Sequence, residues 1–211
     1  MSGIDRELIT LGHQIGRRGL TWGAAGNVSA RSDADHLIIT ATGTRLGELT
    51  LDDLVTCRIA SGGEEPVPKP SVEVEMHRAV YRARPDVRFV AHASPFYTTM
   101  LAATDLEPNP NLTTDTAFYL GSVRSVPYCP PGSRELASAA ARCAAGADDL
   151  ILRNHGCLIL GGSAADVLTR VEALEILSHM TILGALGLSL TPLSSQEADD
   201  LRAALGEHGT A

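Results

Sequence analysis

The sequence predicts an α/β protein in which helices cover a central sheet. Two short apolar runs in the middle of the chain, residues 87–93 and 150–153, are typical of buried strands. Helical patterns precede and follow these runs, and the longest of them covers residues 163–186. The chain has 211 residues, 44% of them hydrophobic, and shows no internal repeat or low-complexity linker. We therefore expect a single domain over residues 1–211.

The N-terminal helix is predicted from its capping residues. Ser2 and Asp5 have the spacing of a capping box, and Gly19 is suited to end the helix that they begin. Its buried face is expected to consist of three apolar residues: Leu8, Leu11 and Ile15.

Two later helices are predicted in the same way. Ser71 is expected to cap a helix over residues 72–83, which stops before Pro85 because a residue that precedes proline avoids helical geometry. A last helix is expected to begin at Ser194, since Glu197 follows at capping-box spacing.

Turn residues set the limits of the shorter strands. Residues 37–40 are expected to form a strand that ends at Thr42-Gly43. Residues 150–153 and 157–160 flank Asn154-His155-Gly156, and this arrangement predicts a β-hairpin.

Composition and charge exclude several classes of function. The chain carries 17 Lys and Arg against 25 Asp and Glu, a formal net charge of −8, which argues against nucleic-acid binding. The longest uncharged run, residues 176–196, contains His179 and Pro192 and is a poor membrane span. The first residues lack the pattern of a signal peptide, and the four cysteines show no CxxC pairing. We expect an acidic cytoplasmic protein with no nucleic-acid or membrane partner.

Two of the seven histidines lie where functional imidazoles are often placed. His92 closes the apolar run at residues 87–93, and His155 lies in the predicted hairpin turn. Strand ends hold a side chain in rigid backbone, which suits a metal ligand or a general base. Glu73 lies in the first turn of a predicted helix, where N–H groups favour an anion; taken alone, it is explained by the helix dipole.

Two glycine-rich turns are candidate anion sites. The backbone N–H groups of residues 23–27 and 42–44 are able to converge on a phosphate or a carboxylate, as is the helix end at Ser71. Neither turn matches GxGxxG or a P-loop, so an ordinary turn remains the alternative for both. No GxSxG elbow is present, which disfavours a serine hydrolase.

In combination, these features occur in the order of a known family. The segments that carry the likeness are Gly19-Leu20-x-x-Gly23-x-x-Gly26-Asn27-Val28-Ser29, Ile39-Thr40-x-Thr42-Gly43, Pro70-Ser71-x-Glu73 with His77, His92, and Asn154-His155-Gly156. From about residue 4 to residue 205 the chain resembles the class II aldolase/adducin family, most closely its bacterial L-fuculose-phosphate aldolase branch.

The resemblance implies a three-layer α/β/α fold with a mainly antiparallel sheet, and a homotetramer with active sites between neighbouring chains. It implies a metal-dependent aldehyde-lyase that acts on a small sugar or a sugar-phosphate-like hydroxy-carbonyl compound. A divalent cation, usually Zn²⁺, with Mn²⁺, Co²⁺ and Fe²⁺ as alternatives, stabilises the enediolate that remains when the C–C bond breaks.

The resemblance also assigns roles to residues of this chain. His92 and His155 correspond to metal ligands, and Glu73 to an acid/base carboxylate that also approaches the metal. The phosphate pocket corresponds to five residues: Gly26, Asn27, Thr42, Gly43 and Ser71. His77 lies four residues after Glu73 but is not a ligand in the family, so we expect it to be structural.

The chain departs from the family pattern at one metal ligand. The family usually has His-x-His at the strand end, whereas this chain has His92-Ala93-Ser94. Since residues 92 and 94 share one face of a strand, Ser94 takes the place of the missing ligand. A neutral hydroxyl is a weak zinc ligand, so Glu73 is a candidate for a permanent third ligand. Two histidines and one carboxylate also suit non-haem iron.

Two further departures concern the substrate. Ala24 and Val72 stand where family members often have hydroxyl groups, and each lost charge-assisted hydrogen bond costs about 1.5–3 kcal/mol. Phosphate binding is therefore expected to be weaker, and an unphosphorylated substrate is an alternative. The tyrosine proton donor of the aldolases aligns with Thr116, and Asp115 and Tyr119 are alternative acid/base residues.

Two other functions fit the same residues. The fold also hosts decarboxylases and epimerases that share the metal-dependent step, so the fold does not fix the reaction. A non-catalytic adducin-like scaffold fits the loss of one ligand and two hydroxyls. The presence of Glu73, His92 and His155 together argues against a scaffold.

Overall fold

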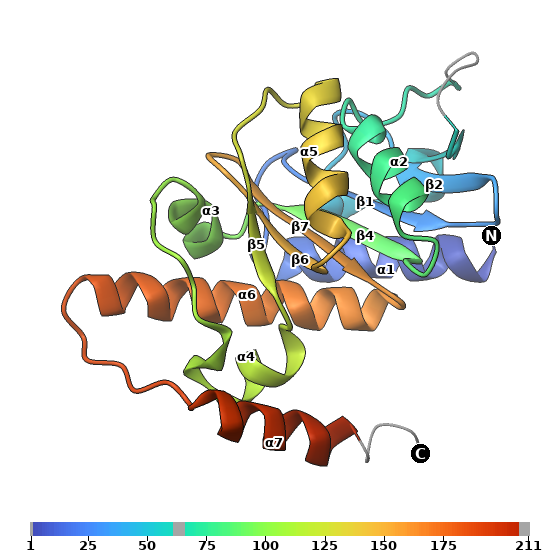
Figure 1. Cartoon of the computed structure of the whole chain (residues 1–211). Helices are drawn as coiled ribbons and strands as arrows, with labels where there is room; N and C mark the ends of the chain where they lie inside the picture. Colours follow the sequence, from blue (N-terminus) through green and yellow to red (C-terminus); the bar gives the residue numbers. More distant parts are fainter. Residues whose placement is uncertain (1, 61–65, 207–211) are drawn as a thin grey trace.

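The computed structural model describes residues 2–60 and 66–206, and these form a seven-stranded sheet between two layers of helices (Figure 1). The strand order is β3-β2-β1-β4-β7-β6-β5. Every neighbouring pair is antiparallel except β5 and β6, which run parallel. The strands are β1 (Asn27–Arg31), β2 (His36–Thr40), β3 (Leu54–Arg58), β4 (Phe89–Ala93), β5 (Val123–Val126), β6 (Asp149–Leu152) and β7 (Gly156–Gly161).

The helices divide between the two faces of this sheet, with α2 and α5 on one face and α1 and α6 on the other (Figure 1). The α-helices are α1 (Gly3–Arg17), α2 (Val74–Ala83), α3 (Phe96–Ala102), α4 (Thr114–Tyr119), α5 (Arg134–Ala144), α6 (Ala164–Ala185) and α7 (Ser195–Gly206). Short 3₁₀ helices are η1 (Leu46–Glu48), η2 (Leu51–Asp53) and η3 (Pro110–Leu112). The predicted α/β/α layers and mainly antiparallel sheet are confirmed.

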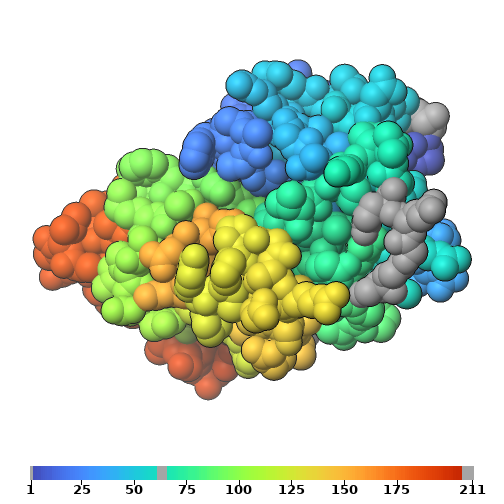
Figure 2. Space-filling view, turned by 90° about the horizontal axis from the view of Figure 1, so that it is seen from above, coloured from blue at the N-terminus to red at the C-terminus, as the bar shows by residue number. Residues whose placement is uncertain are grey.

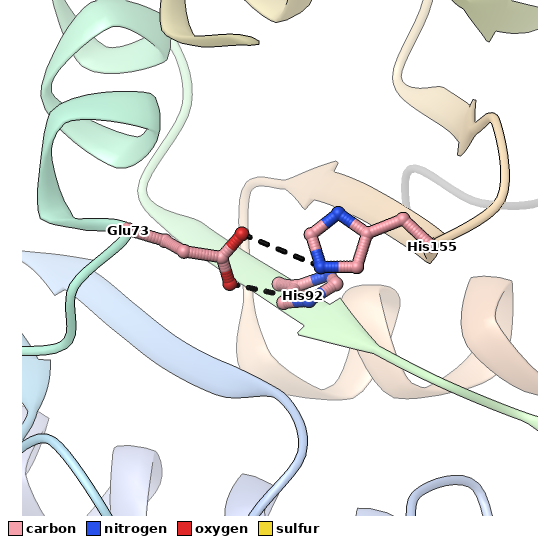
Figure 3. Close-up of side chains that lie close together, drawn as sticks. All are labelled: Glu73, His92 and His155. Atoms are coloured by element: carbon pink, nitrogen blue, oxygen red, sulfur yellow. Dashed lines mark ion pairs between the residues drawn. The ribbon is translucent and has the colours of Figure 1, made fainter. Parts of the chain in front are cut away.

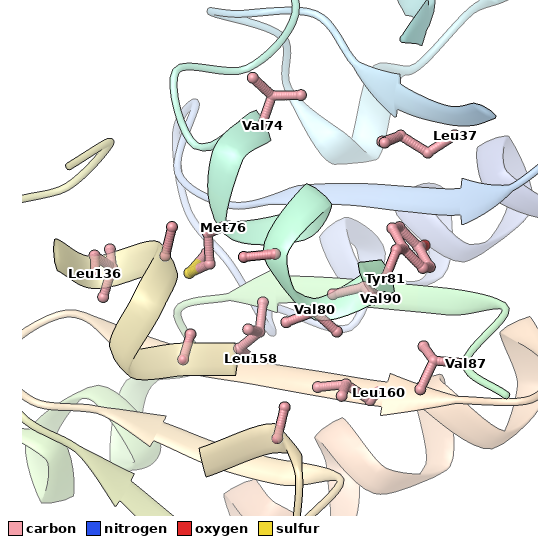
Figure 4. Packing of buried hydrophobic residues seen from close by; sticks show 14 of the residues in the cluster. Leu37, Val74, Met76, Val80, Tyr81, Val87, Val90, Leu136, Leu158 and Leu160 are labelled. Carbon is pink, nitrogen blue, oxygen red and sulfur yellow. The ribbon is translucent and has the colours of Figure 1, made fainter. Parts of the chain in front are cut away.

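Each face of the sheet has its own apolar core, because successive side chains of a strand point to opposite faces. On β4, Val90 packs toward α2 and α5, whereas Phe89 and Ala91 pack toward α1 and α6. Figure 4 shows the first core, where Val80 and Leu136 of the two helices meet the strand residues. Seen from this side, α2 and α5 lie next to each other above the sheet (Figure 2).

Capping residues predicted the starts of α1 and α7, and the apolar pattern of residues 163–186 predicted α6. Ser2 and Asp5 form the capping box of α1. Ser163 caps α6 through the backbone N–H of Asp166, and Ser194 bonds Glu197 before α7. The hairpin of β6 and β7 is also confirmed.

The prediction for the start of α2 was wrong. The helix begins at Val74 instead of residue 72, and its N-cap residue is Glu73 instead of Ser71. The Ser71 hydroxyl accepts a hydrogen bond from the Glu73 N–H, so it closes a turn that precedes the helix. Glu73 is therefore the residue that flanks the helix at its N-terminus and does not belong to its first turn. This position matters for function, because Glu73 is one of the candidate site residues.

Within the part of the chain that the structure describes, no helix combines the length and the hydropathy that a membrane span requires.

Candidate metal centre

Three side chains from distant parts of the sequence meet at one end of the sheet (Figure 3). Glu73 precedes α2, His92 lies on β4, and His155 lies in the turn between β6 and β7. One potential ligand atom from each lies within 4.8 Å of the other two. The His92 Nε2 atom is 3.3 Å from Glu73 Oε2, and the His155 Nε2 atom is 3.5 Å from Glu73 Oε1.

The sheet register brings these residues together. Strands β4 and β7 pair with Ala93 opposite Cys157, so the turn that carries His155 lies beside the end of β4. On the other side of β4, Asn27 of β1 is the direct partner of His92, and paired residues point to the same face. That face is the one covered by α2, at whose start Glu73 lies.

Two glycines allow the neighbouring strands to approach the end of β4. A Cβ atom on Gly26, whose φ is +82°, would lie 2.7 Å from the His92 carbonyl oxygen. A Cβ atom on Gly156 would lie 2.5 Å from the Ala93 carbonyl oxygen. Any larger residue would push β1 or the β7 hairpin away from β4, because backbone atoms cannot yield as a flexible side chain can.

The His92 ring is oriented for ligation. Its Nδ1–H donates to the Cys157 carbonyl oxygen at 2.9 Å, which leaves Nε2 directed toward Glu73. Histidines that bind metals usually donate their second nitrogen to a carbonyl or carboxylate in this way. The ring is almost fully buried, so this orientation is held by packing as well.

The donor set has unused bonding capacity that suits a cation. Glu73 Oε1 is buried and has no hydrogen-bond partner among the described residues, and the His155 Nε2 atom lies 3.5 Å from it. Buried polar atoms are nearly always paired, so an unpaired carboxylate oxygen beside an imidazole nitrogen fits a divalent ion between them.

The electrostatics favour the ligating forms of these groups. Burial raises the pKa of the Glu73 carboxyl, but the imidazoles of His92 and His155 and a hydrogen bond from Asn27 outweigh burial, and the pKa lies below its usual value. Burial and the neighbouring His92 ring lower the pKa of His155. At neutral pH the site therefore holds a carboxylate and a neutral His155 imidazole, the forms that bind metal ions.

The three side chains open onto a cavity of about 260 Å³. All five residues that the sequence assigned to a phosphate pocket line it: Gly26, Asn27, Thr42, Gly43 and Ser71. Ala24 and Val72 line it as well and offer no hydroxyl. Sequence reasoning missed the Trp22 side chain, which is 71% exposed and lines the cavity; a lone tryptophan beside a glycine turn was the available signal.

Ser94 lies one residue beyond the end of β4, which closes at Ala93. It is buried and lines the same cavity as His92 and Glu73. Among the described residues, the potential ligand cluster consists of Glu73, His92 and His155.

The three alternative acid/base residues are not brought to this cavity within the chain. Asp115, Thr116 and Tyr119 lie on α4, and none of them lines the cavity. The buried Thr116 hydroxyl bonds Thr113 and the Pro110 carbonyl oxygen at the start of α4. Their catalytic role stays a prediction.

Comparison with known proteins places this geometry in a family. The family described as class II aldolase and adducin N-terminal domain matches residues 6–182. The chain is 32% identical over 175 residues to 3-oxo-tetronate 4-phosphate decarboxylase of Haemophilus influenzae, covering 80% of this chain and 81% of that protein. It is also 32% identical over 175 residues to L-fuculose phosphate aldolase of Methanococcus vannielii, covering 83% and 93%.

A solved L-fuculose 1-phosphate aldolase superposes with a TM-score of 0.87 at 28% identity, and the match covers 98% of this chain and 97% of that one. Enzymes of this family use a divalent metal, and the cluster of Glu73, His92 and His155 provides a site for one. The chain therefore belongs to the class II aldolase and adducin family.

Proposed function

We propose that the protein is a metal-dependent lyase that breaks or forms a C–C bond in a small sugar or sugar-phosphate-like hydroxy-carbonyl compound. The observation that carries this proposal is the convergence of Glu73, His92 and His155 on a cavity lined by small and hydroxyl-bearing residues. Zn²⁺ suits two imidazoles and a carboxylate, and Fe²⁺, Mn²⁺ or Co²⁺ are accepted by the same donors. A divalent cation bound there supplies Lewis-acid polarisation of the substrate oxygens.

The side chains of the site have two roles, binding of the cation and transfer of a proton. His92 and His155 present Nε2 atoms toward Glu73, so both imidazoles are oriented to hold the cation. Asn27 donates to Glu73 Oε2 at 2.9 Å, whereas Oε1 accepts no hydrogen bond. Oε1 is therefore the oxygen with free bonding capacity: it would contact the cation when substrate is absent, and it would take the proton of a substrate hydroxyl and return it to carbon when substrate is bound.

The described lining of the cavity offers no positively charged side chain to an anionic group of the substrate. The cavity lining contains no lysine or arginine among the described residues, so an anionic group would be bound by backbone N–H groups and by hydroxyls such as that of Ser71. The two named relatives act on phosphorylated compounds. We propose the same substrate class here, with the dephosphorylated compounds as the alternative that Ala24 and Val72 favour.

The direct test is turnover by the purified chain loaded in turn with Zn²⁺, Mn²⁺, Co²⁺ and Fe²⁺. Ketose 1-phosphates and their dephosphorylated forms are offered, and release of an aldehyde is measured. We expect turnover by the wild type and a loss of at least about 100-fold in Glu73→Gln, since general acid–base catalysis contributes about 10²–10⁴-fold. A folded, metal-loaded sample without turnover of any substrate would end the aldolase proposal.

Decarboxylation is a second candidate, and the identity to the Haemophilus influenzae decarboxylase favours it. Loss of CO₂ from a 3-oxo acid leaves an electron pair on carbon that the adjacent carbonyl accepts. Aldol cleavage leaves an electron pair in the same position, so both reactions require stabilisation of negative charge on that carbonyl oxygen. Offering a 3-oxo acid phosphate and measuring CO₂ separates the two, because an aldolase releases an aldehyde instead. Epimerisation would produce neither product.

A scaffold without catalysis is distinguished by metal analysis. An enzyme of the proposed kind binds about one divalent ion per chain after reconstitution. A content well below that value, in a protein that remains folded, would favour the scaffold.

The proposal extends to assembly: one domain over residues 1–211 that forms a homotetramer in the cytoplasm. Large apolar side chains on the surface support it, among them Phe96, Ile176 and Leu186, which are 65%, 55% and 80% exposed. A homotetramer would bury side chains of this kind against a neighbouring chain.

A further inference from the structure

A row of buried polar side chains begins at the cavity-lining residues Glu73 and Asn27 and continues into the protein between α2 and β1. Glu73, His77 and Tyr81 follow one another at four-residue spacing at the start of α2 and along it. Asn27 and Ser29 alternate with Val28 on β1 and face them. All five are at most 5% exposed, although the sequence predicted only a structural role for His77.

These side chains form one continuous series of hydrogen bonds. Asn27 Nδ2 lies 2.9 Å from Glu73 Oε2, and His77 Nε2 lies 2.6 Å from Asn27 Oδ1. On its other side, His77 Nδ1 lies 2.6 Å from Ser29 Oγ, which lies 2.9 Å from the Tyr81 hydroxyl. Both nitrogens of His77 are thus occupied, and neither is available to a metal ion.

The direction of every bond follows from the first one. A carboxylate only accepts, so the amide group of Asn27 directs its NH₂ toward Glu73 and its oxygen toward His77. Since that oxygen accepts, His77 Nε2 carries the hydrogen and Nδ1 is an acceptor. The Ser29 hydroxyl therefore donates to Nδ1, and the Tyr81 hydroxyl donates to Ser29.

We propose that His77 is a positioning residue for the metal centre: as the Nε2–H tautomer, it fixes the Asn27 amide and thereby holds the Glu73 carboxylate with Oε1 toward His155. The proposal rests on the proposed function of Glu73. Turning the Asn27 amide over would place its oxygen against Glu73 Oε2 and its NH₂ against the His77 N–H. Both hydrogen bonds would be lost inside the protein, where unpaired polar groups are costly.

Burial supports this role. It lowers the pKa of His77 to about 3, although the Glu73 carboxylate acts in the opposite direction. The imidazole is therefore neutral at neutral pH, and a neutral ring has one donor and one acceptor nitrogen, as the series requires.

The first test is the tautomer of His77, read from long-range ¹H–¹⁵N correlations of the full chain without added metal. We expect a protonated Nε2 and an unprotonated Nδ1. A protonated Nδ1 would overturn the proposal. The measurement needs neither metal nor turnover, so it decides the positioning role even if the lyase proposal fails.

The second test is zinc affinity, measured by calorimetry on folded protein. His77→Phe removes the donor to Asn27, and we expect zinc binding to weaken by about 10-fold or more, as is typical when a group that orients a ligand is lost. His77→Gln keeps an N–H donor near the position of Nε2 and should restore most of the affinity.

Tyr81→Phe is the matched control, because it removes the far end of the series and leaves the bonds among His77, Asn27 and Glu73 in place. We expect it to bind zinc like the wild type. Equal affinity in His77→Phe and the wild type would contradict the proposal, as would an equal loss in Tyr81→Phe and His77→Phe. If His77→Phe does not fold, the folded His77→Gln variant and the wild-type tautomer decide the question. Weak zinc binding by His77→Gln together with a protonated Nδ1 in the wild type would refute the positioning role.

Zinc binding without turnover would refute the lyase and leave the positioning role intact.

Discussion

At the scale of single residues, Ser94 determines how many strong ligands the end of β4 provides. It lines the cavity beside His92, and its hydroxyl adds little to zinc affinity. We expect Ser94→His to supply a third imidazole and to tighten zinc binding by about 10-fold, which corresponds to about 1.4 kcal/mol. His92→Ala should abolish the tight site, because one histidine and one carboxylate are too few.

Zinc titration of the wild type, Ser94→His and His92→Ala measures these affinities. Ser195→His, which adds an imidazole at an exposed position of α7, is the control for unspecific zinc binding. Equal affinities in the wild type, Ser94→His and His92→Ala would mean that the metal is held elsewhere.

At the scale of secondary-structure elements, a buried ion pair joins β6 to α6. Asp149 is fully buried, and its Oδ2 lies 3.0 Å from Arg170 Nη1. Burial raises the pKa of Asp149 to about 7, against the opposing effect of Arg170. The folded protein therefore binds this proton more tightly than the unfolded chain does, and stability is lost as the pH rises from about 4 to about 7.

We expect Asp149→Asn to flatten this pH dependence, since an amide has no proton to lose in that range. The free energy of unfolding, measured with urea between about pH 4 and pH 8, should fall by up to roughly 4 kcal/mol more in the wild type than in the variant. Asp52→Asn, at an exposed position, is the control and should keep the slope of the wild type. A wild-type slope in Asp149→Asn would show that other groups cause the dependence.

The elements also show what the sequence was able to predict. The capping boxes, the apolar pattern of residues 163–186 and the glycine turn of the β6–β7 hairpin are local signals, and they predicted α1, α7, α6 and the hairpin. Strand β1 was missed because Asn27 and Ser29 are polar, although both are buried. Their burial depends on partners from α2, a long-range contact that no local pattern contains.

The same distinction holds for the site. Glu73, His92 and His155 were assigned by resemblance, and the structure brings these three together. The hydrogen bonds of His77 were not predictable, because they depend on how β1 and α2 are set against each other.

At the scale of the whole molecule, we expect a homotetramer. Light scattering should give a mass of about four times 22.2 kDa, and dilution into the nanomolar range should show whether smaller forms appear. A mass near 22.2 kDa at all concentrations would contradict the prediction.

Asp115, Thr116 and Tyr119 do not line the cavity of their own chain, so any part they play in the reaction depends on a neighbouring chain.

The glycines that border β4 bear on how this molecule is able to diversify. Ala24, Val72 and Ser94 line the cavity, and exchanging their side chains alters what the cavity accepts while the backbone stays in place. Gly26 and Gly156 bring no side chain to the substrate, yet a methyl group at either would strike the backbone of β4. Substitutions at the first three positions therefore change the cavity wall without moving the strands, whereas any side chain at either glycine would displace the strand ends that hold the metal ligands.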